Sequence, residues 1–370
     1  MGTSAATLLA PKTIYKAISQ LDLPGTTLQS LFGWKLGGRN IRRLSGRHFS
    51  YDIFNHTRSV ATGRVPGQVA SRTRPQRVGT VAATFPRAAE VISLLDEDLL
   101  NRREIGESTD DLDFGGESYL TRQEYYLAQR FANLVEFQTA AMLRGSYSYT
   151  ADGDQLRHGF TSGQVQIDFQ VPASNRSGLN MLGAGDILSA SWSSTSTDIP
   201  KQLQLINTAM VQLTGMGLAH VVLTGAGWQH VVNNTKVQAQ GGSTNVVFES
   251  MQRVGSGEFS AVLRAIPWVT FHIVDYGLEV WNGSQESFVK LIEDDYAAFL
   301  PEPSPRWAQY LEGSEIVTEG PGGAKQEQFG FYPYAYATHD PSGWDLCGVF
   351  NGIPALYTPA AIAYGKIVTP

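Results

Sequence analysis

Apolar positions that recur at helical intervals after Thr121 predict one long helix. They are Leu127, Phe131, Leu134 and Met142. Thr121-Arg-Gln-Glu124 has the order of a capping box, a Ser or Thr followed by Glu three residues later, and Gly145 stands where the run ends. The pattern therefore predicts a helix at about 120–145, long enough to form the backbone of a domain.

A second, amphipathic helix is predicted after Asp198. Pro200 lies near its first turn and Gly215 follows its last apolar residue. The apolar positions are Ile199, Leu203, Ile206, Met210 and Leu213. Their alternating spacing of four and three residues places all of them on one face of a helix.

Strands are predicted on both sides of this second helix. Segments 147–149 and 165–171 alternate with a period of two, as in strands with one buried face, and 221–223 and 268–274 are short apolar runs typical of buried strands. Aromatic-rich segments separated by turns continue from 329 to 367. Helices and strands interleave without an internal repeat or a low-complexity linker, so the predicted fold class is α+β.

The first 45 residues show no sustained periodicity. Gly25, Gly33, Gly37 and Gly38 stand among scattered apolar residues. This pattern is typical of an extended arm that finds its packing partner elsewhere.

Two adjacent blocks of opposite charge lie between the arm and the long helix. From Arg39 to Ala88 there are ten arginines and one acid, a net charge of +9, and from Glu90 to Glu124 there are eleven acids and three arginines, a net charge of −8. A basic run is ordinarily a solvated or nucleic-acid-facing segment. The blocks could also neutralise each other within one subunit or between neighbouring subunits, and the residues alone leave these alternatives open.

Composition narrows the class of protein. The 370-residue chain is 42% hydrophobic and 17% charged, with 38 glycines, which fits a globular protein whose surface is covered by other subunits. A net charge of −6 does not indicate a dedicated nucleic-acid binder.

The single cysteine, Cys347, excludes an internal disulfide, as expected for a reducing cytoplasm. No signal peptide or bilayer-length apolar run is present, so no membrane partner is expected.

No motif in the sequence requires catalysis. Val221-Val-Leu-Thr-Gly225-Ala-Gly227 looks like the start of a dinucleotide-binding turn, but His230 stands at the place of the third glycine and no P-loop Lys-Ser/Thr follows. A tight strand-to-helix turn explains these glycines better. The histidines form no zinc-binding pair at helical spacing, and the adjacent carboxylates are typical of solvated loops and helix ends. We therefore expect no enzyme, no cofactor and no metal site.

The order of these features resembles the phage lambda-type major capsid protein E family, whose members adopt the Hong Kong ninety-seven phage fold of tailed-phage shells. The resemblance covers almost the whole chain and is most specific in three segments. They are Arg77 to Pro86, Asp198 to Val232 with its ending Gly227-Trp-Gln-His-Val231, and Gly352-Ile-Pro-Ala-Leu-Tyr-Thr-Pro-Ala-Ala-Ile362. It implies a non-enzymatic major capsid protein that self-assembles into the hexamers and pentamers of an icosahedral shell around the double-stranded DNA genome of a tailed bacteriophage.

The resemblance also implies how the chain is divided. It gives an N-terminal arm at 1–45, an E-loop hairpin at 46–90, a peripheral domain at 91–197 with its spine helix at about 120–145, an axial domain at 198–340, and a strand at 341–370 that returns to the peripheral domain. The E-loop is expected to project with few contacts to its own domains, and the isolated subunit is expected to have exposed edges.

Because an E-loop in such shells lies across a neighbouring subunit, the resemblance favours charge pairing between subunits. The E-loop arginines are Arg58, Arg64, Arg72, Arg74 and Arg77. The acidic partner surface is formed by Asp96, Glu97, Asp98, Asp110, Asp111 and Asp113.

Several partners follow from the same resemblance. The main partner is a further copy of the chain, and packaged double-stranded DNA is a non-specific one. The sequence starts at Met1 without an N-terminal scaffolding segment, so a separate scaffolding protein is expected, with portal and decoration proteins as further candidates. The location is the virion capsid, after folding and assembly in the bacterial host cytoplasm. Some shells of this fold cross-link an E-loop lysine to an asparagine, but no lysine lies between Lys35 and Lys201, so this bond is not expected.

Two alternatives compete with a phage shell. An encapsulin-like bacterial compartment would share the fold and enclose a cargo enzyme, and the contents of purified particles would separate it from a phage shell. A mixed α/β enzyme using the Gly225 turn would show activity as a monomer, but no acid, base or nucleophile accompanies that turn.

Overall fold

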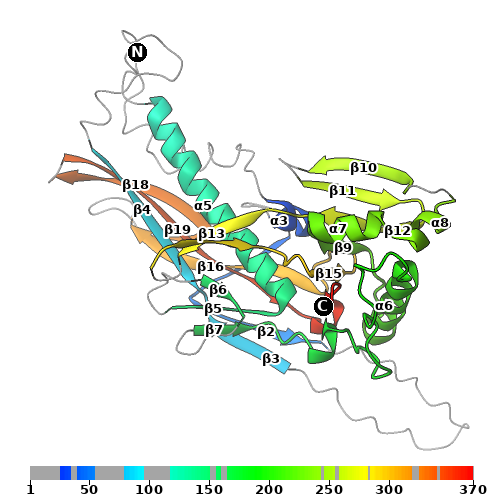
Figure 1. Cartoon of the computed structure of the whole chain (residues 1–370). Helices are drawn as coiled ribbons and strands as arrows, with labels where there is room; N and C mark the ends of the chain where they lie inside the picture. The colour runs from blue at the N-terminus through cyan, green and yellow to red at the C-terminus, as the bar shows by residue number, and fades with distance from the viewer. Residues whose placement is uncertain are drawn as a thin grey trace, which may run out of the picture.

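One long helix and two large sheets form the body of the subunit (Figure 1). The computed structural model describes residues 26–34, 40–54, 79–95, 117–150, 156–159, 165–242, 246–254, 258–281, 284–318, 325–339 and 342–369. Both helices and strands are abundant and alternate along the chain, as an α+β class requires.

Helix α5 (Glu117–Arg144) is the predicted long helix. Apolar residues on its buried face include Leu127, Phe131 and Met142, which confirms the predicted stripe. The helix begins four residues before Thr121, directly after Gly115-Gly116, so the capping-box pattern lies inside it. Glycine is a poor helix former, and this pair marks the start better than the polar pattern does. The helix ends at Gly145, which has a φ of +98°.

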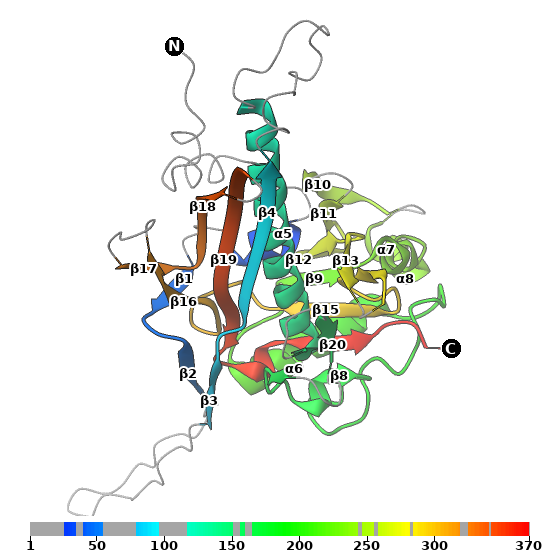
Figure 2. The ribbon, with the colours of Figure 1, turned by 90° about the vertical axis from the view of Figure 1, so that its left-hand side faces the viewer.

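A six-stranded sheet packs along α5. Its longest member, β19 (Ser342–Leu356), pairs antiparallel with β4 (Arg87–Leu95), with β18 (Phe331–His339) and, through its second half, with β16 (Ala308–Thr318). Strands β17 (Lys325–Phe329) and β1 (Ile41–Leu44) both pair with β16. Figure 2 shows the sheet toward the viewer with α5 behind it. The helix therefore covers one face of this sheet.

The smaller strand groups surround this sheet and helix. Strands β5 (Ser146–Tyr149), β6 (Leu156–His158) and β7 (Val165–Asp168) form a three-stranded sheet. Two separate ribbons consist of β2 (His48–Ile53) with β3 (Gly79–Thr84) and of β13 (Gly277–Trp281) with β14 (Glu286–Lys290).

A seven-stranded sheet forms the second half of the molecule. Its strands are β10 (Phe248–Val254), β11 (Glu258–Leu263), β12 (Ile266–Ile273), β9 (His220–Leu223), β15 (Tyr296–Leu300), β20 (Ala363–Lys366) and β8 (Arg176–Ser177), in that order across the sheet. Three helices accompany it, α6 (Ile199–Thr214), α7 (Gly225–Val232) and α8 (Thr235–Gln240). Short 3-10 turns occupy Ala173–Asn175 and Pro359–Ala361. The predicted amphipathic helix is confirmed as α6, which Asp198 caps by accepting a hydrogen bond from the Lys201 amide at 3.0 Å.

Alternate residues of the seven-stranded sheet belong to two different cores. Val221 and Phe299 pack in the cluster formed with α6 and α7, whereas Val222 and Ala298, one position away on each strand, pack in the cluster formed with α5. This is the period of two that a strand buried on both faces imposes. Three connections link this sheet to the three-stranded and six-stranded sheets, namely 169–175, 301–307 and 357–362.

The described part of the predicted N-terminal arm, 26–34, finds a packing partner in α5 of the same chain. Residues 26–34 contain helix α3 (Thr27–Phe32), and Leu28, Phe32 and Trp34 are almost fully buried. Glu136 of α5 accepts hydrogen bonds from the amides of Leu28 and Gln29, at 2.7 and 2.9 Å. The lack of a long periodic run reflects how short α3 is.

Two predicted domain boundaries do not coincide with the boundaries of the sheets. Strands β16, β17 and β18 lie in the six-stranded sheet, although 198–340 was predicted as one axial domain. Strand β20 pairs with β15 in the seven-stranded sheet, although 341–370 was predicted to return to the peripheral side. Strand β19 of that segment packs along α5, and Tyr364 of β20 contacts Arg144 at the end of α5. Strand partners this far apart in sequence leave no local pattern from which pairing could be predicted.

Gly348 on β19 offers a test of how closely α5 and the sheet pack. A Cβ atom there would lie 2.5 Å from Phe131 Cε2 and 3.2 Å from Leu127 Cδ2. We expect Gly348→Ala to lower the free energy of unfolding by about 1–3 kcal/mol through overpacking, measured by urea denaturation of the unassembled subunit. Gly79→Ala is the matched control, because its nearest neighbour would be Ile53 Cβ at 3.8 Å. Equal stability of the two variants would contradict the close packing of α5 on β19.

Candidate assembly interface

The root of a hairpin leaves the body where β2 pairs with β3. The two strands are antiparallel in a register that runs from His48 opposite Thr84 to Ile53 opposite Gly79. Residues 55–78 between them lie outside the described part of the chain. The predicted hairpin segment of 46–90 thus has its ladder at 48–53 and 79–84, while 87–90 already belong to β4 in the six-stranded sheet.

Aromatic packing fixes this root to the body. Phe49 and Tyr51 point inward and are almost fully buried. The ring centroids of Phe49 and Phe85 are 4.9 Å apart, and those of Tyr51 and Tyr357 are 5.6 Å apart. The Phe54 amide donates to the Tyr357 carbonyl at 2.8 Å. The root therefore contacts its own subunit closely, which differs from the expectation of few contacts for the whole segment.

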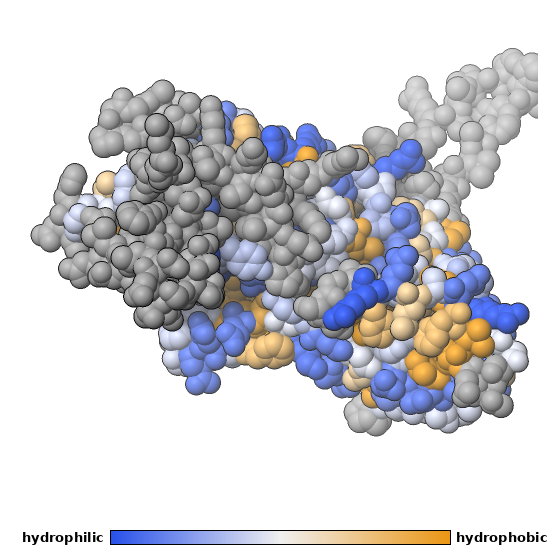
Figure 3. All heavy atoms as spheres, turned by 90° about the horizontal axis from the view of Figure 1, so that it is seen from above, coloured by the Kyte–Doolittle hydropathy of each residue, from blue (hydrophilic) through white to orange (hydrophobic). Residues whose placement is uncertain are grey.

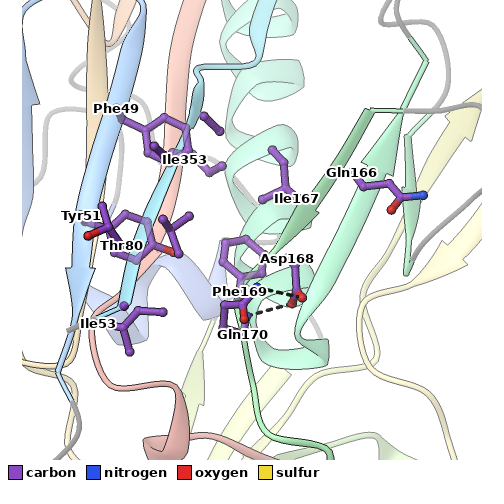
Figure 4. Close-up of a pocket in the computed structure, with 14 residues that line it drawn as sticks. Phe49, Tyr51, Ile53, Thr80, Gln166, Ile167, Asp168, Phe169, Gln170 and Ile353 are labelled. Atoms are coloured by element: carbon purple, nitrogen blue, oxygen red, sulfur yellow. Dashed lines mark hydrogen bonds between the residues drawn. The ribbon is translucent and has the colours of Figure 1, made fainter. Parts of the chain in front are cut away.

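An open cavity of about 390 Å³ lies between this root and β7 (Figure 4). Side chains of Phe49, Tyr51 and Ile353 line one side, and Ile167 of β7 and Phe169 just after it line the other. Polar and apolar atoms share the lining about equally, and its acid Asp168 accepts hydrogen bonds from the amide and the side chain of Gln170. This cavity has no convergent set of polar groups to orient a small ligand.

Three arginines near the root pair with acids of β16 in the same subunit. Arg43 contacts Glu312 at 3.4 Å, and Glu315 receives both Arg47 at 3.1 Å and Arg87 at 3.3 Å. Partial burial works against ionisation of Glu315, but a hydrogen bond from Asn351 and the two arginines outweigh it and lower its pKa. These pairs orient the base of the hairpin.

The predicted interface residues lie outside the described part of the chain. This holds for the arginines 58, 64, 72, 74 and 77 and for the acids 96–98, 110, 111 and 113. Four described residues of the two charge blocks pair within their own subunit. Arg43, Arg47 and Arg87 bind acids of β16, and Glu90 binds Arg130 of α5. Sequence reasoning missed Glu312 and Glu315 because they are about 270 residues away from their partners.

Three buried or half-buried glutamates, Glu124 and Glu136 of α5 and Glu258 of β11, have raised pKa values. Burial raises the pKa of Glu136 to about 8, the hydrogen bonds from Gln29 and Leu28 oppose the rise, and Glu258 on β11 adds to it. Burial, helped by Asp275, raises the pKa of Glu258 to about 7, and burial raises that of Glu124 to about 7. The surroundings of these three residues therefore favour neutral carboxyl groups.

Large surfaces of the subunit are not covered by the described residues. The face of the six-stranded sheet that points away from α5 carries Val91, which is 56% exposed, and the stacked rings of Tyr334 and Tyr336. No described strand pairs with the outer edge of β10, where Met251 is 62% exposed. Seen from above, apolar side chains gather on the end of the molecule formed by the seven-stranded sheet and its helices (Figure 3). Such surfaces are typical of proteins that associate with further chains.

The glycine turn after β9 begins a helix, and the amides of Gly225 and Gly227 at its start already have partners. Thr224 caps α7, and the Gly225 amide donates to Asp275 Oδ1 at 2.7 Å. A carboxylate in this position would repel a phosphate. Gly227 is buried, and a Cβ atom there would lie 3.1 Å from Ile367 Cδ1, so the glycine serves packing. This geometry supports the interpretation as a strand-to-helix turn.

The described residues bring together no evident catalytic set. His220 bonds His272 and Glu302, each at 3.0 Å, but no group of three or more metal-ligating side chains with suitable geometry occurs in the described ranges. Within those ranges no helix is both long and apolar enough to cross a membrane. Uncovered strand edges, exposed apolar surface and a projecting hairpin root define a structural subunit that associates with further chains.

Solved structures similar to this chain include three of phage or prophage origin. A crystal structure of a protein ascribed to a prophage capsid of E. coli matches with a TM-score of 0.60 at 12% identity, over 97% of this chain and 99% of that chain. A phage-related protein of Bordetella bronchiseptica matches at 12% identity and a TM-score of 0.46, over 96% of each chain. The mature capsid of bacteriophage PhiM1 matches at 11% identity and a TM-score of 0.44, over 88% of this chain and 85% of that one. No curated protein sequence matches.

The family model for phage major capsid protein E matches residues 12–367, and the chain belongs to this family. It is the major capsid protein of a tailed phage, forms an icosahedral shell and is a structural protein rather than an enzyme. The fold alone does not separate a phage shell from a bacterial compartment, so the family match decides between these two interpretations. The predicted resemblance and the predicted location in the virion capsid are confirmed.

The raised carboxyl pKa values predict how stability depends on pH. A carboxyl group whose pKa is above its unfolded value of 4.5 stabilises the folded subunit fully below that value, and this contribution is lost as pH rises through the folded pKa. His158 and His272, whose pKa values burial lowers to about 3 and about 4, act in the opposite sense below pH 6.5. The free energy of unfolding should therefore fall between about pH 6.5 and about pH 8.

Denaturant midpoints across this range test the assignment to the buried carboxyl groups. Glu258→Gln keeps the shape of the side chain and removes its charge, so it should flatten the decline. Glu249→Gln, at an exposed position of β10, should leave the slope unchanged. If the free energy of unfolding falls equally steeply with pH in both variants, Glu258 is not a cause of the decline.

Proposed function

We propose that the subunit assembles into hexamers and pentamers through the hairpin that is rooted at β2 and β3. In this proposal the E-loop is the segment beyond that root, α5 and the six-stranded sheet form most of the peripheral domain, and the seven-stranded sheet forms most of the axial domain. The described part of the arm, 26–34, acts as a piece of the peripheral core.

One observation carries this proposal more than any other. The root is fixed by aromatic packing and by ion pairs to Glu312 and Glu315, so the arginines at the root already have partners. The five arginines of 55–78 are accompanied by no acid and no lysine in that segment. A segment of this charge, mounted on a rigid base, is suited to contact an acidic surface of a neighbouring subunit, for which Asp96, Glu97, Asp98, Asp110, Asp111 and Asp113 are the proposed partners.

Further partners belong to the same proposal. A separate scaffolding protein would guide assembly, a portal would occupy one vertex, a decoration protein is a further candidate for the outer surface, and double-stranded DNA would be enclosed without sequence-specific contacts. Segment 36–200 contains no lysine. In this proposal the segment therefore forms no covalent cross-link to a neighbouring subunit through a lysine of its own.

Charge reversal of the arginines tests the proposed contact. Arg58, Arg64, Arg72, Arg74 and Arg77, each changed to Glu, should abolish shell formation while the subunit stays folded. Single surface pairs contribute about 0–1 kcal/mol each, so the effect requires several changes together. Light scattering follows assembly, and circular dichroism checks folding. Wild-type assembly should also slow as ionic strength rises, because salt screens such pairs over about 8–10 Å.

A smaller pair of variants gives a matched comparison. Arg72→Glu with Arg74→Glu should slow assembly more than Arg264→Glu with Arg306→Glu, which causes the same change of net charge at exposed positions outside the hairpin. Normal shells from the folded quintuple variant would show that these arginines do not guide assembly, and that the segment is a solvated or DNA-facing surface.

A further inference from the structure

The ribbon formed by β13 and β14 presents an aromatic and acidic face to solvent. In its register Glu279 stands opposite Phe288, and Trp281 stands opposite Glu286. Trp281 is 44% exposed and Phe288 is 62% exposed. Leu278 and Val280, which alternate with these residues, are buried in the cluster around α5. One face of the ribbon is therefore packed on the body and the other is open.

Helix α5 holds this ribbon at the end where the chain enters and leaves it, at Gly277 opposite Lys290. The Arg144 guanidinium, in the last turn of α5, donates to the carbonyls of Lys290 at 2.7 Å and Leu291 at 2.9 Å. At the same end, on the chain that enters β13, the Tyr276 hydroxyl donates to Asn133 Oδ1 at 3.4 Å. The ring of Phe288 lies over Gly277, where a Cβ atom would be 2.3 Å from it. The open face is thus a fixed platform.

The carboxylates of this face have no cationic partner among the described residues. The nearby ammonium group of Lys290 is bound to Asp294, with both contacts at 2.8 Å. Glu279 and Glu286 form no ion pair within the described ranges. Two unneutralised carboxylates beside two exposed aromatic rings repel phosphate groups and suit a guanidinium, which stacks on aromatic faces and donates paired hydrogen bonds to carboxylates.

We propose that this face, which we call the β13–β14 platform, binds the arginine-rich segment 55–78 of a second copy of the chain. The inference rests on the proposed role of that segment in assembly and names an acceptor surface for it beyond the acidic block. Segment 55–78 has five arginines and no lysine, aspartate or glutamate, so its charge complements the platform.

The position of the root and the symmetry of ring assembly favour a second copy over the same subunit. The root at β2 and β3 lies apart from β13 in both ribbon views (Figures 1 and 2). Placing a segment of one copy on a different surface of the next copy is also the type of contact that closes a ring of subunits.

Reversing the charge of the platform should block assembly, and reversing both sides should restore it. Glu279→Arg with Glu286→Arg, and separately Arg72→Glu with Arg74→Glu, should each lower the yield of shells by about tenfold or more, since close charge pairs at interfaces are strongly coupled. The four changes combined in one chain should recover most of the wild-type yield. Asp186→Arg, at an exposed position of the connection before α6, is the matched control for Glu279→Arg and should assemble normally.

Mixing the two reversed proteins separates a second copy from the same subunit. If the segment reaches a neighbour, six-membered rings that alternate the two proteins regain opposite charges at every contact, and electron microscopy should show rings in the mixture. If the segment binds its own platform, mixing recovers nothing, and the proposal is overturned.

A further pair of outcomes distinguishes this inference from the proposed function. Normal shells from the folded platform variant would overturn the inference alone, since the arginine variants would still report on hairpin-guided assembly. Normal shells from the quintuple arginine variant would overturn both. Circular dichroism and the thermal midpoint of each unassembled variant confirm that a loss of shells does not result from unfolding.

Discussion

The packing of α5 between two sheets is the interaction on which the rest of the subunit depends. One stretch of the helix, which includes Phe131, packs on Phe331 and Phe350 of the six-stranded sheet. Its last turn holds the β13–β14 platform through Arg144, and the cluster around it reaches Val222 and Ala298 of the seven-stranded sheet. The helix and its neighbours therefore form one continuous core, in which a shift of α5 would disturb both sheets.

Elements with a local pattern were predictable from the sequence. The stripe containing Leu127 and Phe131 predicted α5, and the spacing from Ile199 to Leu213 predicted α6, because a helix is built from contacts three and four residues apart. The class of protein followed from the order of such elements together with the family resemblance. Even here the start of α5 was misplaced, since Gly115-Gly116 determined it more than the polar pattern at Thr121.

Features that depend on distant partners were not predictable. Leu28 and Trp34 look like scattered apolar residues of an arm until Glu136, more than 100 residues later, binds the backbone beside them. The net charges of the blocks suggested that the basic block pairs with the acidic block that follows it, but the described arginines at the root pair with Glu312 and Glu315. The net charge of a block indicates that oppositely charged partners exist, but it does not say which strand carries them. Strand β20 shows the same limit, because its partner β15 is set by the fold and by no feature of its own four residues.

The three connections between the seven-stranded sheet and the three- and six-stranded sheets have a mechanical consequence. A shell wall under outward load is stretched in its own plane, and each subunit must carry tension from one neighbour to the next. With 169–175, 301–307 and 357–362 in parallel, and with a shared core beside them, no single covalent link carries the whole force. Extension of one connection is limited by the other two, so the two halves of the subunit respond to load together and the wall stretches less than it would if a single linker joined them.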